Sequence, residues 1–233
     1  MRVCLEISSK YHYGKIVRRV NRFVVWVLAG SDVRACHLHE TGRLRELIYP
    51  GNEVIYINRK RLKTSCLIMA ARDKESWVIT NSDLQRPIAL CMLREMGNVK
   101  PEVKFLDSRI DFFVEPDKYV ETKGCTLAES GVALFPDAPT ERGRKHLEDL
   151  IKVVESGRKA LIYFLIMREN VRCFYPNYIT DPKFSELLFK AIRAGVEFRA
   201  SVFTIRTERK LRIYYVKDVG LCEERPKFNS SDF

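Results

Sequence analysis

Long apolar runs are missing from this chain of 233 residues. The longest, Phe23–Ala29 and Ala160–Met167, fall far short of the roughly 18 residues that cross a bilayer, so we expect no membrane segment. The first residues carry charge and lead into no apolar core, which argues against a signal peptide. Because internal repeats and low-complexity stretches are also lacking, we expect an ordinary globular protein of the cytoplasm.

Closely spaced cysteine pairs are absent as well. The seven cysteines lie far apart and include no Cys-x-x-Cys pair, so neither a disulfide framework nor a zinc ribbon is expected. We therefore predict reduced, mostly buried thiols. His37 and His39 beside Cys36 suggest a metal cluster, but neighbouring side chains of an extended segment point to alternate sides, which makes this the weaker interpretation.

Positive charge is what the chain has in excess, with 41 Lys and Arg against 30 Asp and Glu and a net charge of +11. Residues 1–100 hold 18 basic and 9 acidic residues, a balance of +9, whereas residues 101–233 hold 23 and 21, a balance of +2. A concentrated positive field favours a polyanionic partner, most commonly nucleic acid. On charge alone, a basic protein without such a partner is equally consistent with the sequence.

The first 80 residues show a β-rich pattern of short stretches separated by turn signals, which suits a small barrel or sandwich. The predicted strands are Tyr13–Val20, Phe23–Leu28, Val33–His37, Glu53–Asn58, Ser65–Ala70 and Ser76–Thr80. Basic clusters at Arg18–Arg22 and Arg59–Lys63 fall near the turns. An OB-type barrel with such loops would bind a nucleic-acid backbone, although a solvated hairpin turn explains Arg59–Lys63 equally well.

A helix and linker are predicted over residues 81–100, followed by a change of character. The later segments predict strands, helices about Pro139–Glu155 and after Asp181, and a strand at Ala160–Met167 buried on both faces. The predicted strands around them are Val103–Phe105, Arg109–Val114, Tyr119–Lys123, Val196–Thr204 and Leu211–Val216. This order predicts an α/β domain around a mixed central sheet over residues 101–223, with a poorly ordered tail at 224–233.

Asp111, Glu121 and Lys123 are the residues whose pattern indicates chemistry. If the turn between their strands has three residues, Asp111 lies directly across from Glu121, and Lys123 shares a face with Glu121. Facing carboxylates repel unless a cation lies between them, and oxygen ligands suit Mg²⁺ or Mn²⁺. A nearby lysine orients water or offsets charge on phosphorus, so these are the parts of a metal-dependent phosphodiesterase. The alternative is a surface hairpin whose carboxylates pair with Lys123 and Arg109.

The segment Phe135–Leu147 is dense in polar residues and leads into the predicted helix. Arg142, Lys145 and His146 near its start are candidates to hold phosphate oxygens, and Glu141 to assist catalysis. Gly143 is expected to let the helix sit close to the sheet. An exposed helix carrying pairs such as Glu141 and Lys145 is the alternative interpretation.

Three segments, Ser108–Phe112, Tyr119–Lys123 and Phe135–Leu147, resemble the sugar fermentation stimulation protein family. The resemblance implies an α+β, mixed fold, in which an N-terminal OB-like barrel precedes a domain similar to the PD-(D/E)XK nucleases. Asp111, Glu121 and Lys123 fall on that nuclease motif. Family members are described as DNA-binding and are linked to regulation of sugar metabolism.

Together, the residues and the resemblance predict a DNA-binding protein with a Mg²⁺- or Mn²⁺-dependent nuclease-type site. Asp111 and Glu121 are the predicted metal ligands, and Lys123 and Glu141 complete the catalytic set. The predicted nucleic-acid-binding residues are Arg18, Arg19, Arg22, Arg59, Lys60, Arg61, Arg142 and Lys145. The alternatives are a non-catalytic DNA-binding regulator of sugar metabolism genes that retains the nuclease fold, and an RNA-binding protein that uses the barrel.

Overall fold

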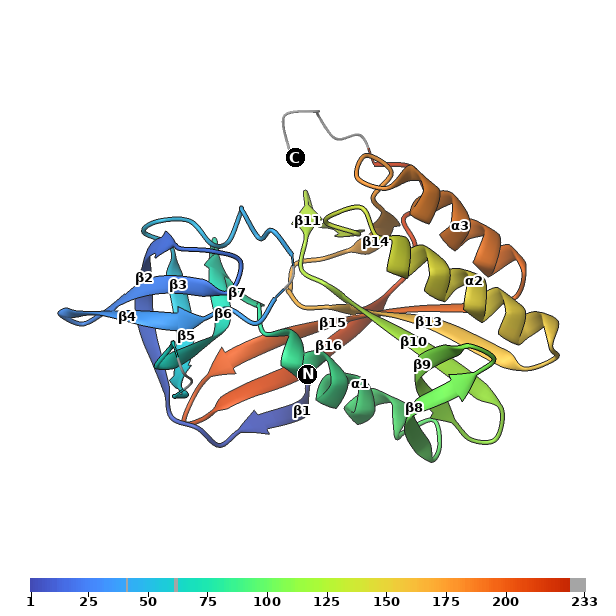
Figure 1. The fold of residues 1–233 in the computed structure, drawn as a ribbon, viewed down its shortest axis with the longest axis horizontal. Coiled ribbons are helices and arrows are strands. Elements are labelled where there is room, and N and C mark those ends of the chain that lie inside the picture. The colour runs from blue at the N-terminus through green and yellow to red at the C-terminus, as the bar shows by residue number, and fades with distance from the viewer. Residues whose placement is uncertain (41, 61–62, 227–233) are drawn as a thin grey trace. The chain divides into compact units, whose positions relative to one another are not determined.

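A computed structural model describes the whole chain except residues 41, 61–62 and 227–233 (Figure 1). The chain forms two compact units, each assembled from separate segments. The barrel unit consists of Met1–Pro87, Met167–Glu169 and Val202–Lys217, and the sheet unit consists of Ile88–Ile166, Asn170–Ser201 and Asp218–Phe233. The sequence predicted two continuous domains, whereas in the structure later segments of the chain complete the barrel unit.

Five strands of the barrel unit form a closed barrel in the order β4-β3-β2-β5-β6, and a parallel pairing of β4 with β6 closes it. These strands are β2 (Tyr11–Arg19), β3 (Val24–Ala29), β4 (Asp32–His37), β5 (Glu53–Asn58) and β6 (Cys66–Asp73). β7 (Ser76–Ile79) pairs with β6. β1 (Arg2–Ile7), which was not predicted, pairs antiparallel with β16 (Leu211–Val219) in the same unit.

The barrel wall follows from alternation along its strands, because successive side chains of a strand point to opposite faces. In β3, Val25 and Val27 are fully buried while Trp26 and Leu28 are exposed. Gly14 of β2 lies where a Cβ atom would come within 2.4 Å of a methyl group of Val27. Only glycine therefore allows β2 to cross so closely over β3.

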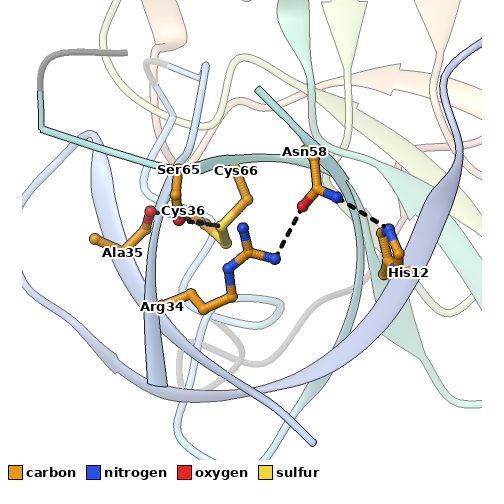
Figure 2. The surroundings of a disulfide bond; sticks show 7 residues. All are labelled: His12, Arg34, Ala35, Cys36, Asn58, Ser65 and Cys66. Atoms are coloured by element: carbon orange, nitrogen blue, oxygen red, sulfur yellow. Dashed lines mark hydrogen bonds between the residues drawn. A yellow bond between two sulfur atoms is a disulfide. The ribbon is translucent and has the colours of Figure 1, made fainter. Parts of the chain in front are cut away.

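The prediction of reduced thiols is wrong for six of the seven cysteines, which are disulfide-bonded, and Cys125 is the buried free thiol. Cys36 of β4 and Cys66 of β6 form a disulfide where these strands pair to close the barrel (Figure 2). Cys173 and Cys222 form another in the sheet unit. The partners are 30 and 49 residues apart in sequence, and only the strand pairing brings them together, so sequence spacing gave no sign of them. Because Cys36 is bonded to sulfur, it offers no thiolate for a metal cluster with His37 and His39.

The sheet unit is built on a mixed sheet in the order β15-β13-β10-β9-β8. Its strands are β8 (Val99–Phe105), β9 (Ser108–Val114), β10 (Lys118–Cys125), β13 (Lys159–Ile166) and the first part of β15 (Glu197–Thr207). β10 runs antiparallel to β9 and parallel to β13, whose side chains are buried from Ala160 onward as predicted. A small second sheet contains β11 (Ala128–Glu129), β12 (Val132–Phe135) and β14 (Cys173–Pro176).

The helices are α1 (Gln85–Leu93), which follows a 3₁₀ turn at Ser82–Leu84, α2 (Glu141–Glu155) and α3 (Pro182–Arg193). Both α2 and α3 begin at side-chain caps, since Thr140 Oγ1 accepts from Gly143 N at 3.0 Å and Asp181 Oδ1 accepts from Phe184 N at 2.9 Å. A Cβ atom on Gly143 would lie 2.7 Å from Thr140 Cγ2 and 3.3 Å from Phe184. This glycine therefore permits close packing of α2 on α3, rather than on the sheet as the sequence suggested.

The predicted fold class is confirmed, because a closed five-stranded barrel is followed by a mixed sheet with helices. Among the residues that the structure describes, we find no helix with the length and apolar character needed to cross a membrane.

Candidate functional site

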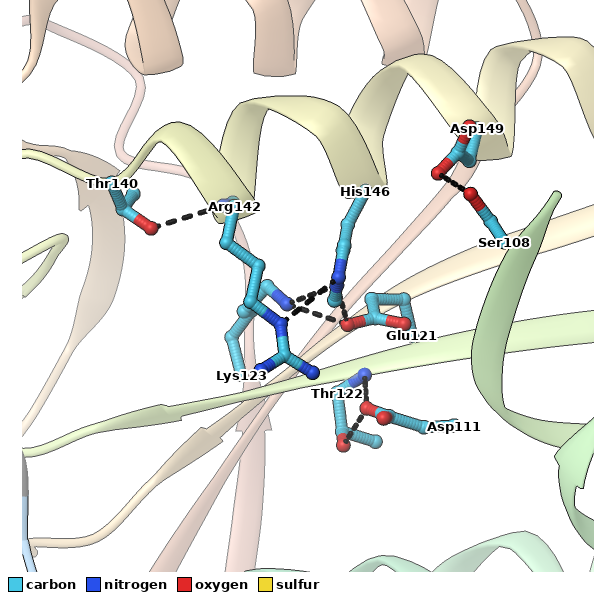
Figure 3. Close-up of polar contacts among 10 residues, drawn as sticks. Ser108, Asp111, Glu121, Thr122, Lys123, Thr140, Arg142, His146 and Asp149 are labelled. Atoms are coloured by element: carbon cyan, nitrogen blue, oxygen red, sulfur yellow. Dashed lines mark hydrogen bonds and ion pairs between the residues drawn. The ribbon is translucent and has the colours of Figure 1, made fainter.

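Two strands and a helix of the sheet unit carry the candidate site (Figure 3). The predicted three-residue turn between β9 and β10 is present, because Val114 pairs with Lys118 and Phe112 pairs with Val120. Alternation along β10 directs Glu121 and Lys123 to one face, toward α2, and Thr122 to the other. The strand thus places a carboxylate and an ammonium group beneath the first turns of a helix.

Glu121 is the buried centre of this site, with a side chain that is 2 % exposed. Its Oε1 accepts a hydrogen bond from Lys123 Nζ at 2.6 Å and another from His146 Nδ1 of α2. Burial raises the pKa of this carboxyl, but the hydrogen bond from His146 and the charge of Lys123 outweigh it, so the net pKa lies below its ordinary value. Glu121 is therefore held as a carboxylate.

His146 links this carboxylate to a second cation. Its Nε2 accepts a hydrogen bond from Arg142 Nε at 3.3 Å, one helical turn earlier. With Nε2 as the acceptor, the proton of a neutral imidazole lies on Nδ1 and is donated to Glu121, and Lys123 Nζ lies 3.0 Å from the same Nδ1. The sequence had grouped His146 with possible phosphate ligands. The sequence shows that His146 and Arg142 are four residues apart and so lie on one face of the helix. It does not show which strand that face covers.

Asp111 lies apart from Glu121. Its Oδ2 accepts from both Thr122 N at 2.9 Å and Thr122 Oγ1 at 2.7 Å. The pairing of β9 with β10 ends at Phe112 and Val120, one position before Asp111 would face Glu121. In Figure 3 Asp111 and Thr122 lie on one side of β10 while Glu121 and His146 lie on the side of α2.

The two carboxylates fit a hard divalent cation in one respect. Within the described part of the chain, the hydrogen bonds to Glu121 all reach Oε1 and those to Asp111 all reach Oδ2, so one oxygen of each remains for another ligand. Mg²⁺ is commonly held by one or two carboxylates, with waters and substrate phosphates as its other ligands. No group of three or more His, Cys, Asp or Glu side chains among the described residues is arranged to hold a metal.

The other α2 residues that were predicted for the site, Glu141, Arg142 and Lys145, differ in whether they contact the cluster around Glu121. Glu141 is 95 % exposed and lies 4.0 Å from Arg144, so the structure does not bring it to Glu121. Lys145 is also exposed, whereas the exposed Arg142 reaches His146. Of Glu141, Arg142 and Lys145, Arg142 is the one that contacts the cluster around Glu121, through His146.

The basic residues of the barrel unit that were predicted to bind nucleic acid lie at two barrel loops. Arg18 lies near the end of β2 and Arg22 lies in the β2–β3 loop. Arg59 and Lys60 begin the β5–β6 loop, while Arg61 falls outside the described residues. OB folds use these two loops, between their first and second and their fourth and fifth strands, to bind oligonucleotides and oligosaccharides.

Arg19 differs from these neighbours because its guanidinium group faces the protein. It donates to the backbone carbonyl oxygens of Asn21, Arg22, Gly42 and Arg43. Burial, with a smaller contribution from the charge of Arg22, lowers the pKa of Arg19. Arg19 thus shapes the β2–β3 loop.

The fold and the site define an α+β protein in which an OB barrel precedes a mixed-sheet domain. In that domain a buried carboxylate contacts a lysine and a histidine. Two family models match the chain: one described as "SfsA N-terminal OB domain" over residues 17–80, and one described as "Sugar fermentation stimulation protein RE domain" over residues 78–209. The chain therefore belongs to the sugar fermentation stimulation protein family.

Individual relatives agree with this assignment. A sugar fermentation stimulation protein homolog of Sulfolobus acidocaldarius is 44% identical over 209 residues, which cover 90% of this chain and 89% of the relative. A homolog of Thermoplasma acidophilum is 40% identical, covering 90% and 92%. The solved structure of Pyrococcus furiosus SfsA in complex with Ca²⁺ is similar with a TM-score of 0.84 and 30% identity, covering 95% of this chain and 99% of that one.

Proposed function

We propose that this protein is a DNA-binding, metal-dependent nuclease whose phosphodiester-cleaving site lies around Glu121. The observation that carries the proposal is the ionised carboxylate of Glu121, buried between Lys123 and His146. A buried carboxylate is costly to keep charged, and such groups concentrate at functional sites. In a surface hairpin, the alternative considered from the sequence, the carboxylate of Glu121 would be exposed rather than buried.

Glu121 would hold a Mg²⁺ or Mn²⁺ ion through the oxygen that the described residues leave without a hydrogen bond. Asp111, which Thr122 holds on the other side of β10, would turn toward Glu121 to supply the second ligand. The bound ion would polarise a phosphate oxygen and lower the pKa of a bound water. Support comes from the similar Pyrococcus furiosus protein, whose structure was solved in complex with Ca²⁺, another cation that prefers oxygen ligands.

The chain's own residues have separate parts in this proposal. His146 fixes Glu121 through its Nδ1–H group, so that the carboxylate keeps one orientation. The Lys123 ammonium group, next to Glu121, orients the attacking water and offsets negative charge as it grows on the phosphate. The exposed guanidinium group of Arg142 is available to bind a phosphate oxygen of the substrate.

The central test incubates the protein with plasmid DNA, single-stranded DNA and RNA in Mg²⁺ or Mn²⁺. We expect cleavage of DNA by the wild type and a loss of at least about 100-fold in Asp111→Ala and Lys123→Ala, as for removal of other catalytic electrostatic groups. Glu141→Ala is the matched control, since this exposed carboxylate lies on the same unit without contacting Glu121.

Equal cutting by the wild type and both variants would place the activity elsewhere. Calorimetric titration with Ca²⁺, which reports binding without turnover, should show heat for the wild type and none for Asp111→Ala.

A non-catalytic DNA-binding regulator is the second candidate. It is favoured by the fact that Glu121 already has two cationic or polar partners and Asp111 is satisfied by Thr122, so neither carboxylate needs a metal for its stability. Its proposed link to sugar metabolism genes rests on the family name alone. DNA binding without cleavage, together with silent Ca²⁺ titrations, would select this candidate over the nuclease.

A further inference from the structure

The outer face of the barrel strands β2, β3 and β4 exposes large apolar side chains. Trp26 and Leu28 point outward from β3 with 37% and 39% of their surfaces exposed, and Val33 of β4, which pairs with Leu28, is exposed as well. Outward positions of a sheet that faces water are normally polar. Contiguous exposed apolar surface of this kind marks an interaction site.

Positive charge is interleaved with this apolar surface. The register of β2 on β3 sets Arg18 opposite Trp26 and Lys15 opposite Leu28. The guanidinium carbon of Arg18 lies 4.1 Å from the centre of the Trp26 ring. Across β2, β3 and β4 the sequence has one acidic residue, Asp32, at the very start of β4. The face therefore suits an anionic partner that also carries flat apolar groups.

A second pairing of an aromatic ring with a cation lies at the end of the same face, in the β2–β3 loop. Phe23 is 44% exposed, stacks on His37 with ring centres 6.2 Å apart, and has the Arg22 guanidinium carbon 5.6 Å from its own centre. The side chain of Asn21 accepts from Phe23 N at 2.9 Å and Val24 N at 3.0 Å, which fixes the loop. The ring is thus presented by a preordered backbone, which lowers the entropic cost of binding.

We propose that this face binds single-stranded nucleic acid, with bases stacked at Trp26 and Phe23 and phosphates held by Lys15, Arg18 and Arg22. The inference deepens the proposed nucleic-acid binding and rests on it. In a duplex the faces of the bases are covered by their neighbours, so a duplex can use the cations of this face but not its rings. A single strand offers both groups, one ring and one phosphate for each nucleotide.

The test measures fluorescence anisotropy of labelled oligo(dT) and of a labelled duplex, both in EDTA so that no cleavage intervenes. We expect the wild type to bind oligo(dT) more tightly than the duplex. Trp26→Ala and Phe23→Ala should each weaken oligo(dT) binding roughly 5- to 100-fold and leave duplex binding nearly unchanged. Trp26→Phe, which keeps an aromatic ring, should restore much of the loss.

Matched controls separate stacking from charge. Tyr49→Ala removes another exposed aromatic ring of the barrel unit, outside these strands, and should bind as the wild type does. Arg18→Gln should weaken the strand and the duplex alike and flatten the salt dependence of both. An oligo(rU) arm distinguishes RNA from DNA as the source of the strand.

The outcomes are distinguishable. If Trp26→Ala loses affinity equally for the strand and the duplex, or loses none, the stacking face is refuted while nucleic-acid binding stands. If the wild type binds neither probe, both the face and the proposed DNA binding fall. Cleavage is absent from these measurements, so they do not depend on the site around Glu121.

Discussion

At the scale of single residues, the contacts of Glu121 determine its charge and which of its two oxygens can bind another ligand. One of its oxygens is occupied by Lys123 and His146, and these partners keep the group ionised despite its burial. An ionised group in this setting is a fixed feature of the fold, because removing one partner leaves the others charged and out of water. The same contacts leave the second oxygen as the chemically available one.

Replacing Glu121 by glutamine should lower the free energy of unfolding by about 3 kcal/mol at neutral pH in metal-free buffer, because Lys123 loses its anion. Since folding lowers the pKa of Glu121, its contribution is fully present above the ordinary value of 4.5 and is lost as pH falls through the folded value. Urea denaturation at a series of pH values measures this. A difference between variant and wild type that grows below pH 4.5 would contradict the assignment.

At this scale the sequence was enough to predict how the strands pair, but not the directions in which individual side chains point. The turn at Glu115-Pro116-Asp117 was enough to predict the register of β9 and β10. The carboxylate of Asp111 could not be placed, because its contact with Thr122 depends on where the strand ladder ends. Glu141 likewise looked suitable by spacing, and only the rotation of α2 on the sheet shows that it faces water.

At the scale of elements, the starts of α2 and α3 are tied together by one buried carboxylate. Asp181, which is 3 % exposed, caps α3 with one oxygen, and its other oxygen accepts from Thr140 N at 2.8 Å and Arg144 at 2.6 Å. Farther along α2, Asp149 accepts from Ser108 Oγ of β9 at 2.6 Å. These contacts fix the helix at two points, and His146 lies between them.

Asp181→Ala should lower the free energy of unfolding by about 3 kcal/mol, through a lost helix cap and the unpaired donors of Thr140 and Arg144. Thermal and urea unfolding measure the loss. Glu141→Ala, at the exposed start of α2, is the control and should change stability by less than about 0.5 kcal/mol. Equal effects of the two substitutions would show that Asp181 does not join the helices.

Capping residues could be recognised from the sequence, and the pattern Asp181-Pro182 correctly predicted the start of α3. The reach of the same carboxylate to Thr140 could not be predicted, since it depends on how two helices some 40 residues apart pack. Short strands such as β11 and β14 were also missed, because two to four residues carry too little periodicity to be seen.

At the scale of the whole molecule, disulfides join segments that are distant in sequence. Cys36–Cys66 fastens the seam of the barrel, and Cys173–Cys222 fastens β14 to a segment near the C-terminus. The widely spaced cysteines looked unpaired because the sequence does not reveal which strands meet. In a closed barrel the two edge strands must meet, and that closure is what creates the first pair.

The variant Cys36→Ala/Cys66→Ala should unfold at lower urea concentration, with a loss of about 3–4 kcal/mol expected from loop entropy for partners 30 residues apart. Adding a reductant should destabilise the wild type more than this variant, because the variant has already lost the bond. Unchanged stability of the variant would mean that strand pairing alone holds the seam.

Strand β15 passes from the sheet unit at Ser201 to the barrel unit at Val202, and β16 then pairs with β1 at the other end of the chain. No single cut in the gene therefore yields either unit whole. A fragment ending at Pro87 would lack Val202–Lys217, and a fragment beginning at Ile88 would carry that segment without its partners. The two family models meet near residue 80, but the barrel unit includes residues far beyond that boundary. A gene that encoded only the first matched part would lack those residues, and a gene that encoded only the second would carry them without the rest of the barrel unit.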